Sequence, residues 1–64
     1  MPQVSGKEFI EELAKHKIHK IVSTKWFHER AVCWSERIEY YYSDTIMIGW
    51  EVKAENSDPY YYIK

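Results

Sequence analysis

Two kinds of hydrophobic spacing divide the chain into a helical beginning and a β-rich remainder. Between residues 6 and 17, apolar side chains recur every three or four positions, as on one stripe of a helix. From Lys20 onward, β-branched and aromatic residues dominate, and residues 45–53 (TIMIGWEVK) place apolar side chains at every second position. The pattern predicts an N-terminal helix followed by a mainly antiparallel sheet.

The start of the helix carries the clearest local signal. Ser5 and Glu8 have the spacing of a capping box, and Val4 and Phe9 have that of a hydrophobic staple. The stripe continues through Ile10, Leu13 and Ala14, and the sequence Lys15-His16-Lys17 places cations where the dipole of a last helical turn favours them. We therefore predict one helix over residues 6–17.

The strands are predicted at residues 20–27, 30–34, 37–42, 45–53 and 60–63, the last being an edge strand because it follows Pro59. The fold class is α+β, with the helix packed on an α-β-β-β-β-β meander. An alternative remains open for residues 29–42, which also have apolar side chains at helical spacing and would then give an αβαββ order.

The three consecutive tyrosines of residues 38–50 (IEYYYSDTIMIGW) can be placed by strand register. If Ile38, Tyr40 and Tyr42 share the core face with Ile46, Ile48, Trp50 and Val52, the loop must have an odd number of residues. A loop of residues 43–45 satisfies this condition. It predicts the pairs Tyr42–Ile46, Tyr40–Ile48, Ile38–Trp50, Tyr41–Met47, Glu39–Gly49 and Arg37–Glu51.

A loop of residues 55–58 extends this register to the last strand, opposing Val52 to Tyr61 and Trp50 to Ile63. The residues then predicted to point away from the core, as a protein-binding face, are Tyr41, Met47, Gly49, Tyr60 and Tyr62. Tyrosine and methionine are enriched at interfaces, although cross-strand tyrosines also simply stiffen small sheets.

Length and composition favour a binding role for this face. The chain has 64 residues with three Trp, six Tyr and two Phe, which we interpret as one small domain over residues 1–64. Shortage of core at this size favours self-association. We expect a small interaction protein that is a homo-oligomer, an inhibitor or an adaptor, with a homodimer favoured and the last strand offering a second route to it.

One cysteine, Cys33, cannot form a disulfide within the chain, which favours a reducing compartment. No apolar run reaches membrane length, and residues 1–15 lack the apolar stretch of a signal peptide. We expect a cytoplasmic protein that does not act on a membrane.

The net charge is −1, but cations gather in residues 15–30. This basic stretch, a candidate nucleic-acid patch, comprises Lys15, Lys17, Lys20, Lys25 and Arg30. Aromatic sheets with nearby cations bind single strands. Acidic residues surround the tyrosines on their strands and in the adjoining loops and would repel a polyanion, so we rank nucleic-acid binding second. Those residues are Glu39, Asp44, Glu51, Glu55 and Asp58.

Catalysis and metal binding are not expected. His16, His19, His28 and Cys33 could supply zinc ligands, but they form neither a CxxC pair nor an HxxxH pair on a helix. Dipole-complementing or solvated histidines, and a small buried cysteine, explain them more simply. The chain has two glycines and no phosphate-binding loop, so we predict no catalytic residue, no metal and no cofactor.

Overall fold

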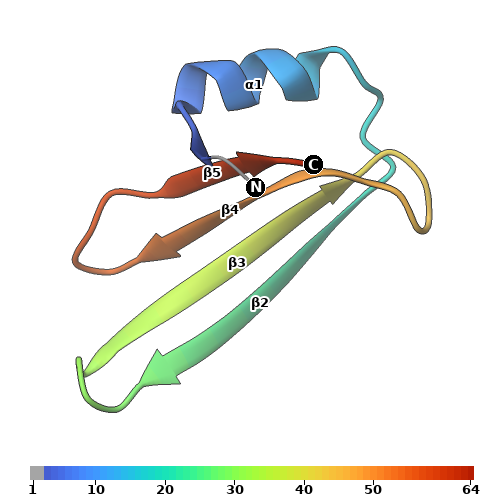
Figure 1. Cartoon of the computed structure of the whole chain (residues 1–64). Coiled ribbons are helices and arrows are strands. Elements are labelled where there is room, and N and C mark those ends of the chain that lie inside the picture. The colour runs from blue at the N-terminus through green and yellow to red at the C-terminus, as the bar shows by residue number, and fades with distance from the viewer. Residues whose placement is uncertain (1–2) are drawn as a thin grey trace.

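The computed structural model describes residues 3–64, which form one helix and a five-stranded antiparallel sheet. The elements in chain order are β1 (Gln3–Val4), α1 (Gly6–Ala14), β2 (Lys20–His28), β3 (Cys33–Tyr41), β4 (Met47–Ala54) and β5 (Tyr60–Ile63). The strands lie in the order β1-β5-β4-β3-β2 (Figure 1). The α+β class with an N-terminal helix is therefore confirmed, and the helical alternative for residues 29–42 is wrong.

The element boundaries differ from the prediction in three places. Residues 33–41 form one continuous strand, with a turn at 29–32, where we had predicted two short strands. The fifth strand is instead β1, before the helix, and it covers the outer edge of β5 through Val4 and Tyr61. The helix ends at Ala14 with Lys15 as its C-cap, so the cations after it do not form a last turn.

The helix begins as predicted. The Ser5 side chain accepts a hydrogen bond from the Glu8 amide at 3.1 Å, and the Glu8 carboxylate accepts one from the Ser5 amide at 3.4 Å. The two bonds satisfy amides that the first turn leaves without intrahelical partners. They fix the point at which the chain leaves β1 and crosses over the sheet.

The helix covers only part of one side of the sheet. It contacts β4 and β5, and Figure 1 shows the β2–β3 hairpin extending well beyond it. Phe9 is the centre of the contact, being 2% exposed, with its ring centroid 5.5 Å from that of Tyr40 and 5.1 Å from that of Tyr61. Ile10, which we had placed on the buried stripe, is 67% exposed, because the helix packs on the sheet through a narrow strip around Phe9.

A β-bulge in β4 sets which residues face the helix. Tyr41 pairs with Met47 as predicted, but Tyr40 pairs with Gly49, because Ile48 is an extra residue in β4. Beyond this point every predicted β3–β4 pair is shifted by one, so that Ile38 opposes Glu51. A shift of one residue moves side chains to the other side of the sheet. Trp50 and Val52 therefore leave the predicted core face.

The β4–β5 register is also shifted by one from the prediction. Trp50 opposes Tyr62 and Glu51 opposes Tyr61, which makes the connecting loop longer than we expected. Gly49 lies on the helix side, and a Cβ built on it would be 3.1 Å from Cε1 of Phe9. Our placement of Gly49 on the outward face was wrong. The glycine is where the sheet makes room for the Phe9 ring.

Candidate protein-binding surface

The sheet surface that points away from the helix forms a continuous layer of aromatic and charged side chains. We call it the open face. Strand alternation and the observed register assign to it Lys20, Val22, Thr24, Trp26, Arg37, Glu39, Tyr41, Met47, Trp50, Val52, Tyr60 and Tyr62. Of the predicted face, Tyr41, Met47, Tyr60 and Tyr62 are brought together there and Gly49 is not. Arg37, Glu39, Trp50 and Val52 are added.

Trp50 lies at the centre of the open face, flanked from both neighbouring strands. The Tyr62 ring of β5 stacks on it with a centroid distance of 5.1 Å and an interplanar angle of 17°. The Arg37 guanidinium of β3 lies over its ring, 4.9 Å from the centroid. Stacking and cation–π contacts of this kind hold the rings in fixed positions.

A second group of contacts continues the layer toward β2. Arg37 Nη2 lies 2.9 Å from the Glu39 carboxylate, and the Tyr41 hydroxyl donates to Glu39 at 3.3 Å. The Lys20 ammonium lies 4.8 Å from the centre of the Tyr41 ring. Desolvation by these neighbours, together with the Glu39 charge, raises the pKa of Tyr41, which keeps its hydroxyl protonated as a donor. The layer is therefore preorganised.

Tyr60 differs from the other aromatic residues of the open face. It pairs with Val52 at the margin of the sheet, where its side chain is 45% exposed. Trp50, Tyr41 and Tyr62 are half-buried by neighbouring side chains of the sheet, although no other element of residues 3–64 covers them. The face thus has a packed centre and an accessible aromatic margin.

Glu51 points to the other side of the sheet, where its carboxylate accepts a hydrogen bond of 2.7 Å from the Tyr40 hydroxyl. Burial, followed by this hydrogen bond, raises the pKa of Tyr40 to about 12. Glu51, one of the acidic residues that we expected next to the outward tyrosines, is thereby removed from the open face, whereas Glu39 remains on it. The shift follows from the bulge at Ile48, which a parity argument without a bulge could not find.

The basic stretch does not form one patch. Lys20 lies on the open face, Lys25 points to the helix side, and Lys15 forms an ion pair with Glu12 at 3.4 Å. Lys17 lies in the connection after the helix, and Arg30 lies in the turn after β2. The antiparallel strand alternates its side chains, so cations that are close in sequence are divided between two surfaces.

The four candidate metal ligands separate into two groups. His16 contacts Glu12 at 3.2 Å and His19 contacts Asp44 at 2.8 Å, near the start of β2. The other two, His28 and Cys33, oppose each other at the far end of the β2–β3 hairpin. Within residues 3–64, no group of three or more His, Cys, Asp or Glu side chains could hold a metal ion.

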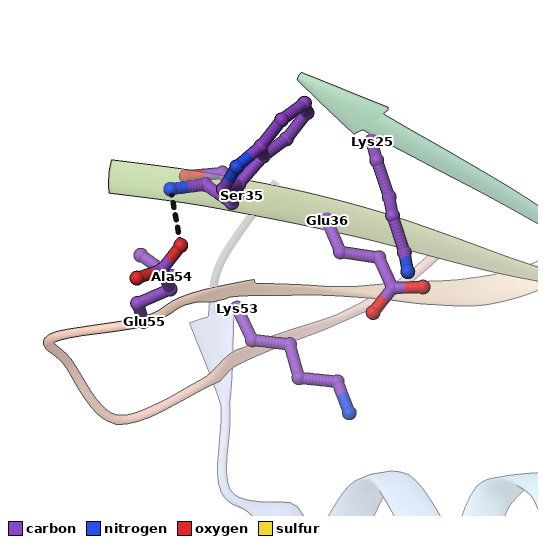
Figure 2. Close-up of a pocket in the computed structure, with 7 residues that line it drawn as sticks. Lys25, Ser35, Glu36, Lys53, Ala54 and Glu55 are labelled. Atoms are coloured by element: carbon purple, nitrogen blue, oxygen red, sulfur yellow. Dashed lines mark hydrogen bonds between the residues drawn. The ribbon is translucent and has the colours of Figure 1, made fainter. Parts of the chain in front are cut away.

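A hollow of about 500 Å³ lies on the helix side of the sheet, beyond the N-terminal end of the helix (Figure 2). Its lining residues are Lys25, Trp34, Ser35, Glu36, Lys53, Ala54 and Glu55. Glu55 accepts a hydrogen bond of 2.9 Å from the Trp34 amide, and Glu36 accepts one from Ser23. Both carboxylates thus tie neighbouring segments of the sheet together, and we assign them no catalytic role.

Comparison of the chain with protein-family models, with curated proteins and with solved structures gives no significant match. Across residues 3–64, no helix has the length and apolarity needed to cross a membrane.

Proposed function

We propose that the chain is a non-enzymatic interaction protein that binds a partner protein through the open face. The observation that carries the proposal is the fixed layer around Trp50, held by Arg37 and Tyr62 and covered by no element of residues 3–64. Trp, Tyr and Arg are the residues that most often dominate binding energy at protein interfaces. Rings that are already ordered lose little entropy on binding. The single cysteine, Cys33, supports a cytoplasmic site of action.

The same geometry favours a protein over a nucleic acid. Bases stack on free aromatic faces. In this structure the Trp50 ring is flanked by Arg37 and Tyr62, and Lys20 lies over the Tyr41 ring. The open face therefore offers ring edges, methylene groups and a guanidinium, which suit side chains of a protein.

A single-stranded nucleic acid is the second candidate. The observation in its favour is that Glu51 turns away from the open face and Glu39 is paired with Arg37. Lys20, whose ammonium donates to the Asp44 carbonyl at 2.6 Å, then has no ion pair among residues 3–64. Such binding would weaken steeply with added salt, because it releases counterions. If the material that the immobilised chain retains from a lysate is lost after nuclease treatment, the partner is a nucleic acid and not a protein.

Two tyrosines of nearly equal exposure provide a matched test. Tyr60 is 45% exposed on the open face, and Tyr42 is 43% exposed on the helix side, where its ring stacks on His16. The test measures which proteins each immobilised chain retains from a nuclease-treated lysate of the native host. It compares the wild type with the variants Tyr60→Ser and Tyr42→Ser. We expect one stoichiometric protein to be retained by wild type and Tyr42→Ser and lost with Tyr60→Ser.

The stability of both variants is measured in parallel, so that unfolding is not mistaken for loss of binding. Surface substitutions away from special features change the free energy of unfolding by about 0.5 kcal/mol or less. Equal retention by the two folded variants, or equal loss from both, would show that the open face is not the binding surface.

A further inference from the structure

Strand β2 is an uncovered edge of the sheet. Among residues 3–64 it pairs with β3 alone, whereas the opposite edge strand is the two-residue β1, which covers the outer side of β5. Its apolar side chains are exposed on both sides of the sheet, by 56% at Ile21, 38% at Val22, 36% at Trp26 and 45% at Phe27. A long apolar edge strand is a template for pairing with another strand. We had expected edge pairing at the last strand, and β1 occupies that position.

The hydrogen bonds of β3 identify which backbone groups of β2 are free. Tyr42 donates to Ile46 and Trp34 accepts from Glu55, so even-numbered residues of β3 direct their backbone groups toward β4. Odd-numbered residues of β3 then bond to the even-numbered residues of β2, which oppose them. The remaining residues of β2 direct their amides and carbonyls to the open edge. They are Ile21, Ser23, Lys25 and Phe27.

We propose that β2 pairs antiparallel with β2 of a second copy of this chain, about a two-fold axis at Thr24. In this register Val22 opposes Trp26 of the second copy, Ile21 opposes Phe27, and Ser23 opposes Lys25. Pairs between β-branched and aromatic side chains are among the favourable cross-strand pairs. All four outward-facing residues then donate and accept backbone hydrogen bonds across the interface.

The neighbouring symmetric registers are less complementary. With Lys25 on the axis, two ammonium groups oppose each other, which is destabilising. With Ser23 on the axis, Lys20 opposes Trp26 and Lys25 opposes Ile21, so no apolar pair forms. Only the axis at Thr24 pairs apolar residues with apolar residues on both sides of the sheet. Each Lys25 keeps Glu36 as its cross-strand neighbour within its own chain.

The symmetry has a consequence for the open face. A two-fold axis that relates antiparallel edge strands is perpendicular to the sheet, so both open faces point the same way and both helices point the opposite way. Val22 of one copy and Trp26 of the other join the two faces across the axis. The dimer thereby presents one ten-stranded surface. The role of this joined surface in partner binding rests on the proposed function, whereas the β2–β2 pairing does not.

Cysteine substitutions test the register directly. Opposed residues of a non-hydrogen-bonded pair have Cα atoms about 4.5 Å apart, within the range of a disulfide. A residue one position off the axis, such as Ser23 or Lys25, lies two positions out of register with its own copy, on a diagonal of about 7–8 Å, and bridges poorly. Thr24→Cys is compared with Ser23→Cys and Lys25→Cys, with oxidised glutathione as the oxidant. Wild type, which has buried Cys33, measures the background.

We expect Thr24→Cys to become largely cross-linked under conditions that leave both controls mainly uncross-linked. Preferential cross-linking of Ser23→Cys or Lys25→Cys, or equal cross-linking of all three, would overturn the register. Under reducing conditions, sedimentation equilibrium should give twice the chain mass for wild type. A wild-type chain that stays monomeric at every concentration would overturn the dimer.

A proline variant tests the backbone contact. Lys25→Pro removes an outward amide and is expected to give a monomer, whereas Lys25→Ala keeps the amide and the dimer. Dimers of equal strength in both variants, each shown to be folded, would overturn the pairing. Tyr60→Ser should retain the dimer mass and the Thr24→Cys cross-link, so failure of the pairing is distinguishable from failure of partner binding.

Discussion

Replacing Gly49 with alanine should destabilise the protein strongly, because the added methyl group has no space. Its Cβ would clash with the Tyr62 carbonyl oxygen, and it would lie 3.3 Å from Cα of Ile63 and 3.1 Å from the Phe9 ring. Two of these three neighbours are backbone atoms of β5, so relief requires moving a strand. Overpacking of this kind costs up to about 3 kcal/mol.

The reduced entropy of the unfolded alanine chain offsets about 0.4–1 kcal/mol of that cost, since Gly49 does not have a positive φ angle. The net loss is then about 2 kcal/mol. With an unfolding entropy of about 2.1 cal/mol/K per residue, a chain of 64 residues should lose about 15 °C in Tm.

Thermal and urea unfolding, followed by circular dichroism, measure the effect, and Gly6→Ala is the matched control. A Cβ at Gly6 would lie 3.1 Å from the Tyr61 ring, which is the movable end of a side chain. The packing cost and the gain from the unfolded state should roughly cancel, leaving Tm within about 5 °C of wild type. A Gly49→Ala variant that melts close to Gly6→Ala would contradict the close approach of β4 to β5 and to Phe9.

Three further substitutions test other parts of the structure. Ser5→Ala should lower the free energy of unfolding by about 1 kcal/mol in urea titrations, because it removes the capping box, while Ser57→Ala, in the β4–β5 loop, should leave it nearly unchanged. Phenolate absorbance should show a transition near pH 12, well above the ordinary tyrosine pKa of 10.0, and Tyr40→Phe should remove it. The pKa of Tyr40 is higher in the folded than in the unfolded chain, so unfolding between pH 10 and about pH 12 releases a proton. The free energy of unfolding of the wild type should therefore fall more than that of Tyr40→Phe as the pH rises through this range. Val32→Gly should stabilise the β2–β3 turn by about 1 kcal/mol, since Val32 is exposed with φ of 49°, a conformation that costs a β-branched residue about 1–2 kcal/mol; an unchanged or lower urea midpoint would contradict this strain.

The sequence was sufficient to predict the elements whose signals are local. The capping residues Ser5 and Glu8 defined the start of the helix, and the Tyr41–Met47 pair followed from the short loop between them. The end of the helix was not predictable in the same way. Lys15-His16-Lys17 has a composition typical of a last turn, but His16 contacts Glu12 and stacks on Tyr42, outside the helix. Tertiary contacts determined that boundary.

The non-local features were missed because nothing in the sequence around them marks them. Ile48 in a strict alternation gives no sign of a bulge, although the glycine that follows it is a common companion of one. Gln3 and Val4 are too short a segment to show a strand period, yet their pairing covers the outer side of β5 and leaves β2 as the long edge strand among residues 3–64. The two register shifts, one between β3 and β4 and one between β4 and β5, cancel between β3 and β5. Tyr41 therefore still points to the same side of the sheet as Tyr60 and Tyr62, as predicted.

The bulge connects the core to the proposed binding surface. Without the extra residue, Trp50 would point toward the helix and Glu51 would join the outward tyrosines. With it, Gly49 admits the Phe9 ring at the helix side, and Trp50 reaches the open face between Arg37 and Tyr62. One inserted residue thus creates space where the helix packs and replaces an anion with an indole on the exposed surface. Because the one short helix of residues 3–64 covers the opposite side of the sheet, this placement leaves the stacked Trp50–Tyr62 pair outside the core, on the proposed binding surface.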